Sequence, residues 1–552
     1  MASTIQDKLM QSIPRAVVHL RAQKNGNRLG LIFGAGIGVD LGYPNWDELV
    51  QRISDHKEVG AAKVWNKLRS EGAGGRAVTR SLASVTQMLF SEFRKRKIKE
   101  RRITRSLTFV QEQRIKTDWL RLIHSQLYER LLDRSVRVEK LKSHPYLEAF
   151  RRIIKKSPLT VTYNFDDSLE LMLAEARSED EEDTERGFER IDSPDAQFKR
   201  DQGVIYHPNG CITAIFSDGT SRDVVFADAS FQDQLLSAAT GKFVHLSNHL
   251  FRNTCLLIGL SLEDSTLQSL LRQNAVQNPG NVHYAVHFLK DDCELDAEAQ
   301  SAIFTANFES FGIITLFLRN AEIKALAGLI EMSAQTFERD FGKYDPKFVY
   351  YLIGSVGAGK STAAGNFRNL INYDEWIDER DPNLAKPEAE VDDDEAIERM
   401  NAYITEQFRK KNFALHSCAE GIHLVDRAPL DPLTFQTPEK RAARAATLLA
   451  EVTDRNSRTI VKGHIIQLTA PVADLKIRNS LKHKYWPSKE FERLIGAIDE
   501  VYGSIDRSIV CTSGRSAAAV AKELARIIFL DPYQPVDLQN ELAIQARGAA
   551  HE

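Results

Sequence analysis

The sequence predicts an α/β fold with two units, each built on a parallel sheet. Two apolar runs rich in β-branched residues, at 28–36 and 348–360, each lead into a glycine-rich turn and then a helical pattern. Further strand-like segments at 159–165, 253–261 and 283–289 alternate with stretches of helical length. Such alternation favours parallel strands with helices on both faces of the sheet. We therefore expect two successive α/β domains on this chain of 552 residues.

The domain boundaries follow from changes in composition. Residues 60–155 contain few Gly or Pro and many Lys, Arg, Leu and Glu, which indicates a helical insertion in the first domain. A stretch rich in Leu, Ala and Glu at 321–345 predicts a helical linker, and Pro346 marks the start of the second domain. We thus expect a first domain at 1–320, a second at 346–535 and, at 536–552, a tail with little to bury.

Composition limits the class of protein. The 73 Lys and Arg residues nearly balance the 76 Asp and Glu residues, so the net charge of −3 gives no bulk attraction to nucleic acid or an anionic membrane. No apolar run approaches the roughly 18 residues that a membrane span needs, and the N-terminus lacks the apolar core of a secretory signal. The five cysteines form no CxxC pair, which argues against a thiolate zinc site and suits a reducing cytoplasm.

Two charged segments stand out. The basic run 94–105 could contact phosphates, but no aromatic residues are interleaved to stack on bases, so a solvated helix face is favoured. The acidic run 178–185 is expected to be an exposed loop. Neither nucleic acid nor a membrane is therefore indicated as a partner.

The first glycine-rich turn has the residues of a pyrophosphate site. Gly34, Ala35 and Gly36 follow a buried strand and open a helix, where small residues let backbone N–H groups approach phosphates closely. A dinucleotide is the natural ligand. The spacing is G-x-G-x-G rather than G-x-G-x-x-G, and Asp55 lies in a helical pattern, which disfavours an ordinary dehydrogenase. A tight strand–helix connection without a ligand is the alternative.

The longer string GAGIGVDLGYPNW (34–46) resembles the first NAD-binding motif of the SIR2 family. Three further segments agree in order with that family: TYNFDDSLE (162–170), YHPNG (206–210) and IGLSLED (258–264). The resemblance covers roughly residues 15–320 and implies a Rossmann-like domain that binds NAD.

The resemblance also implies roles for individual residues. Asn164 and Asp166 would lie beside the nicotinamide ribose, and either His207 or Asn209 would take the position of the family's catalytic His. The family's His is usually followed directly by Gly, and this sequence departs from that pattern, so both residues stay open. The NAD-binding residues would be Gly34, Ala35, Gly36, Ile37, Pro44, Trp46, Gly259 and Ser261.

The chemistry implied is hydrolysis rather than deacylation. Sirtuin deacylases carry two CxxC pairs that bind zinc, and this chain has none. The helical insertion and the P-x-W ending of the first motif look like the SIR2-type effectors of bacterial anti-phage systems, which hydrolyse NAD to nicotinamide and ADP-ribose. Cationic nicotinamide is already a good leaving group, so ribose positioning, an aligned water and a hydrogen-bond acceptor suffice.

The second glycine-rich turn is a P-loop. Residues 354–361 fit G-x-x-x-x-G-K-[ST] between a strand and a helix, so backbone N–H groups would cradle phosphates, Lys360 would reach the β/γ oxygens and Ser361 would ligate Mg²⁺. The cofactor expected is ATP or another nucleoside triphosphate with Mg²⁺. The P-loop residues in contact with nucleotide would be Gly354, Gly357, Gly359, Lys360, Ser361 and Thr362.

The segments after the P-loop resemble the deoxynucleoside and thymidylate kinase group. Asp426 at the end of a strand is a candidate Mg²⁺ ligand, with Arg427 beside it. Asp374 would accept a proton from a substrate hydroxyl, or is a surface charge. The phosphate clamp would consist of Arg478, Lys482 and Lys484, with a surface charge as the alternative for Arg478.

Three functions follow from these motifs. The first is an NAD hydrolase in anti-phage defence that is regulated by the P-loop domain, with a phage-derived trigger and a homo-oligomeric assembly expected. The second is a nucleoside or nucleotide kinase whose SIR2-like part only binds a regulatory nucleotide. The third is a sensor in which neither site turns over.

Overall fold

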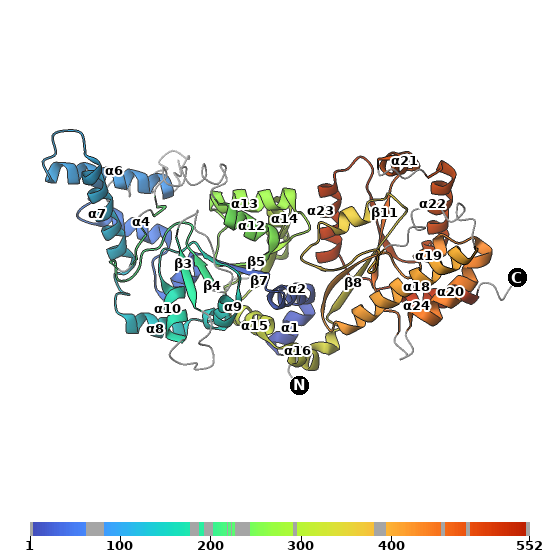
Figure 1. The fold of residues 1–552 in the computed structure, drawn as a ribbon. Helices are drawn as coiled ribbons and strands as arrows, with labels where there is room; N and C mark the ends of the chain where they lie inside the picture. Colours follow the sequence, from blue (N-terminus) through green and yellow to red (C-terminus); the bar gives the residue numbers. More distant parts are fainter. Residues whose placement is uncertain are drawn as a thin grey trace. The chain divides into compact units, whose positions relative to one another are not determined.

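A computed structural model describes residues 4–61, 82–176, 187–192, 203–217, 219–221, 224–226, 243–290, 295–379, 394–453, 459–481 and 486–547. The acidic run 178–185 and the predicted clamp residues Lys482 and Lys484 lie outside these ranges. The chain forms two compact units (Figure 1). The seven-stranded unit comprises Lys24–Asn274 and His283–Glu331, and the five-stranded unit comprises Met1–Gln23, Ala275–Val282 and Met332–Glu552.

The sheet of the seven-stranded unit has the order β3-β4-β2-β1-β5-β6-β7, and every neighbouring pair is parallel. The predicted α/β class is confirmed. The central strands β1 and β5 are buried along their whole length, as expected for parallel strands covered on both faces. The strands are β1 (Leu29–Phe33), β2 (Thr160–Thr162), β3 (Phe188–Ile191), β4 (Gly203–Tyr206), β5 (Thr254–Ile258), β6 (His283–Phe288) and β7 (Ile313–Leu318).

Within the predicted insertion at 60–155, the described residues from 82 onward are largely helical. Its helices α6 and α7 pack on each other and on α4 (Figure 1). The basic run 94–105 lies at the end of α6 and in the connection to α7, and two of its arginines pair with acids of α7, Arg94 with Glu112 and Arg101 with Asp118. The helices of this unit are α3 (Ala35–Leu41), α4 (Trp46–Asp55), α6 (Leu82–Glu100), α7 (Phe109–Leu127), α8 (Arg134–Ser143), η1 (Leu147–Phe150), α9 (Arg151–Lys156), α10 (Ser168–Ala176), α12 (Val244–Arg252), α13 (Ser265–Gln277), α14 (Ala297–Phe311) and α15 (Asn320–Glu331).

The sheet of the five-stranded unit has the order β12-β11-β8-β10-β9 and is also parallel throughout. Its strands are β8 (Lys347–Ile353), β9 (Ile371–Tyr373), β10 (Gly421–Asp426), β11 (His464–Thr469) and β12 (Arg507–Cys511). Its helices are α1 (Ile5–Ser12), α2 (Pro14–Asn25), α16 (Ala334–Phe341), η3 (Gly342–Tyr344), α17 (Lys360–Ala364), α18 (Asp394–Ser417), α19 (Asp431–Thr434), α20 (Pro438–Val452), α21 (Val472–Ser480), α22 (Ser488–Tyr502), α23 (Ala517–Phe529) and α24 (Leu538–Arg547).

The N-terminal helices belong to the five-stranded unit, which differs from the boundary expected at residue 320. The cause is a contact far along the chain: Arg21, with a fully buried side chain, bonds both carboxylate oxygens of Glu420 at 2.6 and 3.0 Å. The expected linker 321–345 is helical but is divided, since α15 lies in the seven-stranded unit and α16 in the five-stranded unit.

The prediction of a tail at 536–552 is wrong for residues 538–547. They form α24, whose Leu538 and Leu542 are fully buried in the core that also contains Leu448 and Val452 of α20. Leu538 and Leu542 are four positions apart, so they lie on one face of the helix, and this spacing indicates a buried face rather than a frayed tail.

Within the described part of the chain, none of the helices combines the length and the apolar character that crossing a bilayer would demand.

Candidate functional sites

The predicted NAD-site residues gather at one edge of the seven-stranded sheet. Strands β4, β2, β1 and β5 are consecutive neighbours, and the segments after their carboxyl ends carry the YHPNG, TYNFDDSLE, GAG and IGLSLED motifs. The chain leaves β1 toward β2 on one side and β5 toward β6 on the other. The reversal of direction between β1 and β5 is a topological switch point, where open α/β sheets bind ligands.

The GAG loop meets the β5 loop at that switch point. Gly36 N donates to Gly259 O at 2.9 Å, and Gly34 N donates to Ile258 O at 3.0 Å. A Cβ on Gly34 would lie 2.5 Å from Gly259 O, and one on Gly36 would lie 2.9 Å from Gly259 Cα. Glycines are therefore required here by close backbone approach, and Gly259 itself has a φ of +71°.

Asn164 carries an unsatisfied polar atom at this edge. Its Oδ1 is buried and has no hydrogen-bond partner among the described residues. Its backbone N donates to Thr162 Oγ1 at 3.2 Å, and its carbonyl faces His207 Nδ1 at 3.1 Å. A buried acceptor without a donor is costly unless a ligand or water supplies one.

His207 is completely buried, and both of its ring nitrogens are engaged. Nδ1 lies 3.1 Å from the Asn164 carbonyl, and Nε2 lies 2.7 Å from Glu170 Oε1 on α10. Burial alone would lower the pKa of His207, but the Glu170 carboxylate outweighs burial and raises it. Glu170 lies inside the quoted TYNFDDSLE motif, yet sequence reasoning gave it no role.

Asn209 lies two residues after His207 and is also buried. Its side chain hydrogen-bonds the carboxyl group of Asp264, which precedes α13 and accepts from Leu267 N at 2.7 Å. Burial raises the pKa of Asp264. The segments after β4 and β5 are thus joined through Asn209 and Asp264. Ser261, in the segment after β5, is exposed.

Asp166 is bound to the start of α10. Its Oδ1 accepts from Ser168 N at 3.0 Å, and Ser168 Oγ in turn bonds Tyr43 of the first motif at 3.1 Å. Burial raises the pKa of Asp166. These contacts give Asp166 a structural role in addition to the role that the resemblance implies.

Aromatic side chains connect the first motif to the Asn164 segment. Trp46, the first residue of α4, stacks on Phe226 at 6.3 Å between centroids, and Phe226 contacts Phe165 edge-on at 5.5 Å. Pro44 precedes Asn45, whose side chain caps α4 in a capping box with Glu48. The Pro44–Trp46 part of the motif therefore leads into a helix, and Trp46 is linked through Phe226 to Phe165, the residue that follows Asn164.

The helical insertion braces the same segment through residues that sequence reasoning missed. Tyr128 at the end of α7 donates to Asp167 Oδ1 at 3.0 Å, and Arg137 of α8 binds the same oxygen at 2.7 Å. Asp167 Oδ2 accepts from Ala214 N at 3.2 Å. The two adjacent acids in NFDD, Asp166 and Asp167, are the sequence signal that could have suggested a structural role for Asp167.

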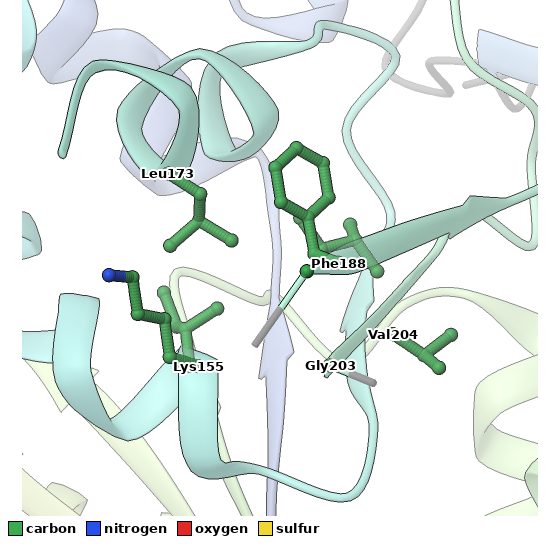
Figure 2. Close-up of a pocket in the computed structure, with 8 residues that line it drawn as sticks. Lys155, Leu173, Phe188, Gly203 and Val204 are labelled. Carbon is green, nitrogen blue, oxygen red and sulfur yellow. The ribbon is translucent and has the colours of Figure 1, made fainter. Parts of the chain in front are cut away.

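A small pocket lies at the opposite end of the sheet (Figure 2). Phe188 and Gly203, which line it, are the first residues of β3 and β4, so it lies at their amino ends. Its volume of about 10 Å³ holds at most one water. This pocket cannot be a nucleotide site.

The P-loop after β8 adopts a conformation that requires its glycines. Gly354, Gly357 and Gly359 have φ values of +139°, +82° and +105°. A Cβ on Gly354 would lie 2.3 Å from Leu468 O of β11. Lys360 Nζ donates to the carbonyls of Gly354 and Ser355 at 2.8 and 3.2 Å, and burial together with Arg427 lowers its pKa.

Ser361 and Asp426 lie together as a metal site would need. Ser361 Oγ donates to Asp426 Oδ2 at 2.9 Å, while Asp426 Oδ1 is buried and has no hydrogen-bond partner among the described residues. A hydroxyl and a carboxylate are oxygen ligands of the kind that Mg²⁺ prefers. Thr362, next to Ser361, is exposed.

Glu375, rather than the predicted Asp374, faces this cluster. Asp374 is exposed, whereas Glu375 Oε1 binds Arg427 Nε at 2.6 Å. Burial would raise the pKa of Glu375, but Arg427 and Lys360 outweigh it and lower the pKa to about 2. Lys411 of α18 donates to the carbonyls of Asp426 and Glu375 at 2.7 and 3.0 Å.

Arg478 of α21 contacts the protein's own loops. Its guanidinium donates to Thr512 Oγ1 at 2.8 Å and Thr512 O at 2.9 Å, and reaches Gly357 O at 3.4 Å. These contacts place Arg478 against the P-loop backbone.

Comparison with known proteins agrees with the sequence motifs of the first unit. Residues 158–310 match the model of a family described as "SIR2-like domain". No curated protein matches the chain.

Three solved structures are similar to parts of the chain. Shikimate kinase from Acinetobacter baumannii in complex with shikimate is 15% identical with a TM-score of 0.22, over 34% of this chain and 95% of that one. Deoxyadenosine kinase from M. mycoides with bound dATP is 15% identical with a TM-score of 0.25, over 32% and 96%. NadR protein in complex with NAD and AMP-PNP is 12% identical with a TM-score of 0.25, over 68% and 89%.

The family match includes the Asn164, His207 and Gly259 segments, which the sheet brings to one switch point together with the GAG loop. The chain therefore carries a SIR2-like domain in its seven-stranded unit, joined to a P-loop α/β unit.

Proposed function

We propose that the SIR2-like unit hydrolyses NAD to nicotinamide and ADP-ribose, that the P-loop unit binds a Mg²⁺-nucleoside triphosphate and regulates it, and that the chain acts in anti-phage defence by NAD depletion. The observation that carries the proposal is the buried Asn164 Oδ1, which has no hydrogen-bond partner among the described residues. Asn164 follows β2, the neighbour of the strand β1 that leads into Gly34 and Gly36. A ribose hydroxyl or a water would supply the donor that this atom lacks.

The reaction breaks the bond between ribose C1′ and the nicotinamide nitrogen. The bonding pair leaves with nicotinamide, which becomes neutral, and a water oxygen bonds to C1′ and releases a proton. The main requirement is positioning, because the leaving group is cationic at the start. Asn164 Oδ1 would accept from the ribose or the water, and the backbone of the GAG loop would hold the pyrophosphate.

The P-loop unit has the residues for a nucleotide site. Lys360 and the loop backbone would bind phosphate oxygens, and Ser361 and Asp426 would ligate Mg²⁺, which neutralises phosphate charge when bound. A kinase activity is the second candidate. The observation that favours it is the ionised Glu375, which Arg427 holds close to Lys360 and which could orient a substrate hydroxyl by accepting its hydrogen bond.

One experiment separates these functions. Purified chain is incubated with NAD and with nucleosides or nucleoside monophosphates, with and without ATP or dTTP. Nicotinamide and transferred phosphate are quantified, and the binding of NAD and of ATP is measured separately. Nicotinamide release supports the hydrolase; phosphate transfer to nucleosides or nucleoside monophosphates without nicotinamide release supports the kinase. A chain that binds both nucleotides and turns over neither would be a sensor, which contradicts the proposal.

A further inference from the structure

We propose that Glu170 and His207 form a positioning pair that aims Asn164, and that His207 is not the general base. The inference rests on the proposed function and deepens it, because it assigns roles around the reacting ribose. It also adds Glu170, which neither the motif resemblance nor the family match assigns.

The pair stands on two short contacts in a buried place. Glu170 Oε1 lies 2.7 Å from His207 Nε2, and the opposite ring nitrogen lies 3.1 Å from the Asn164 carbonyl. The His207 side chain is 0% exposed and that of Glu170 is 13% exposed. The series of hydrogen bonds from Glu170 through the imidazole of His207 to Asn164 is therefore buried in the interior.

The chemistry of the two partners fixes what the ring can do. A backbone carbonyl only accepts, so Nδ1 must carry a proton and donate to Asn164 O. A second proton lies in the hydrogen bond between His207 Nε2 and Glu170 Oε1, and either of these two atoms can be its donor. The ring thus has no lone pair directed at a substrate, which a general base needs.

Asn164 depends on side chains for its orientation. The backbone carbonyl of Asn164 is held by His207, and its backbone N donates to Thr162 Oγ1 at 3.2 Å. Its Oδ1 is buried and has no hydrogen-bond partner in the described part of the chain. A shift of the Asn164 backbone would therefore move this atom directly, and displacements of about 1 Å can cost about 100-fold in rate.

The test uses variants that keep or remove each contact. Glu170→Ala removes the carboxylate, whereas Glu170→Gln keeps an amide that can hydrogen-bond Nε2. His207→Asn places an N–H near the position of Nδ1, whereas His207→Ala does not. The matched control is Glu175→Ala. It removes a carboxylate on the same helix, but this carboxylate pairs with the exposed Arg134.

We expect Glu170→Ala to lower kcat for nicotinamide release by about 10- to 100-fold with KM for NAD changed less than about 3-fold. Glu170→Gln and Glu175→Ala should stay within about 3-fold of the parent chain, and His207→Asn should retain more activity than His207→Ala. If His207→Asn is as inactive as His207→Ala while Glu170→Ala is fully active, His207 is the base and the inference is wrong.

A second readout is independent of turnover. In the full chain labelled with [¹⁵N]histidine, the ring signals absent from the spectrum of His207→Asn belong to His207. They should show a protonated Nδ1 and should shift in Glu170→Ala. Unchanged His207 signals in Glu170→Ala would overturn the pairing, whereas intact pairing in a chain that cleaves no NAD would refute only the proposed function.

Discussion

Lys411 offers a sharp test of the buried cluster beneath the P-loop. Its side chain is buried on α18, and Nζ donates to the carbonyls of Asp426, the last residue of β10, and of Glu375, two residues after β9. Burial lowers the pKa of Lys411 from 10.5 to about 8. Lys411→Met removes the ammonium and keeps an apolar side chain of similar length.

The sign of the pH effect follows from proton binding. Between about pH 8 and 10.5 the unfolded chain holds a proton on Lys411 that the folded chain has lost, so stability rises with pH in this window. The difference between the pKa of Lys411 in the unfolded and the folded chain corresponds to about 3 kcal/mol in total, of which about 2 kcal/mol is recovered between about pH 7 and pH 9.5. Below pH 7 the cost of the buried ammonium is present in full.

The assay is urea unfolding of the full chain and of Lys411→Met at pH 7.0 and 9.5. Other groups also titrate, but they are common to both proteins, so the difference between parent and variant isolates Lys411. The parent should gain about 2 kcal/mol relative to Lys411→Met over this range. A difference that does not change with pH would refute the reasoning.

Three further predictions concern the two loops and the reaction. Gly34→Ala should lower the free energy of unfolding by about 1–3 kcal/mol in urea titrations, because the new Cβ meets the Gly259 carbonyl; Gly38→Ala, with 3.6 Å to its nearest neighbour, is the control and should not. Lys360→Ala should alter the ATP dependence of NAD cleavage, with a coupling of about 1–3 kcal/mol between sites; identical, nucleotide-independent rates would contradict it. The chain should not deacylate acyl-lysine peptides in the presence of NAD. Deacylated peptide that forms with the parent chain but not with Asn164→Ala would overturn this prediction.

Most of the strands that lead into site residues could be predicted because each combines an apolar, β-branched run with a following turn. β1, β5, β8 and β10 are buried along all or nearly all of their length, so their sequences lack the polar alternation of exposed strands. β9 has only three residues and β4 four, which is too short for periodicity to indicate a strand.

The residues that were missed depend on register or on distant contacts. Asp374 and Glu375 are adjacent after β9, and a difference of one position decides which of them faces Arg427. The contact between Arg21 and Glu420 joins positions 399 residues apart, so no local pattern could assign the N-terminal helices to the P-loop unit. The hydrogen bond between His207 and Glu170 likewise joins the segment after β4 to α10, across 37 positions of the sequence.

The central claim is that Asn164 sits where the glycosidic bond of NAD is broken. The most direct measurement is a time course of nicotinamide and ADP-ribose from NAD with the full chain and with Asn164→Ala, after circular dichroism and thermal unfolding have shown that both are equally folded. We expect equimolar products from the parent chain and a rate at least about 100-fold lower in Asn164→Ala. Equal rates in the two proteins, or no nicotinamide from the parent chain under any nucleotide condition, would contradict it.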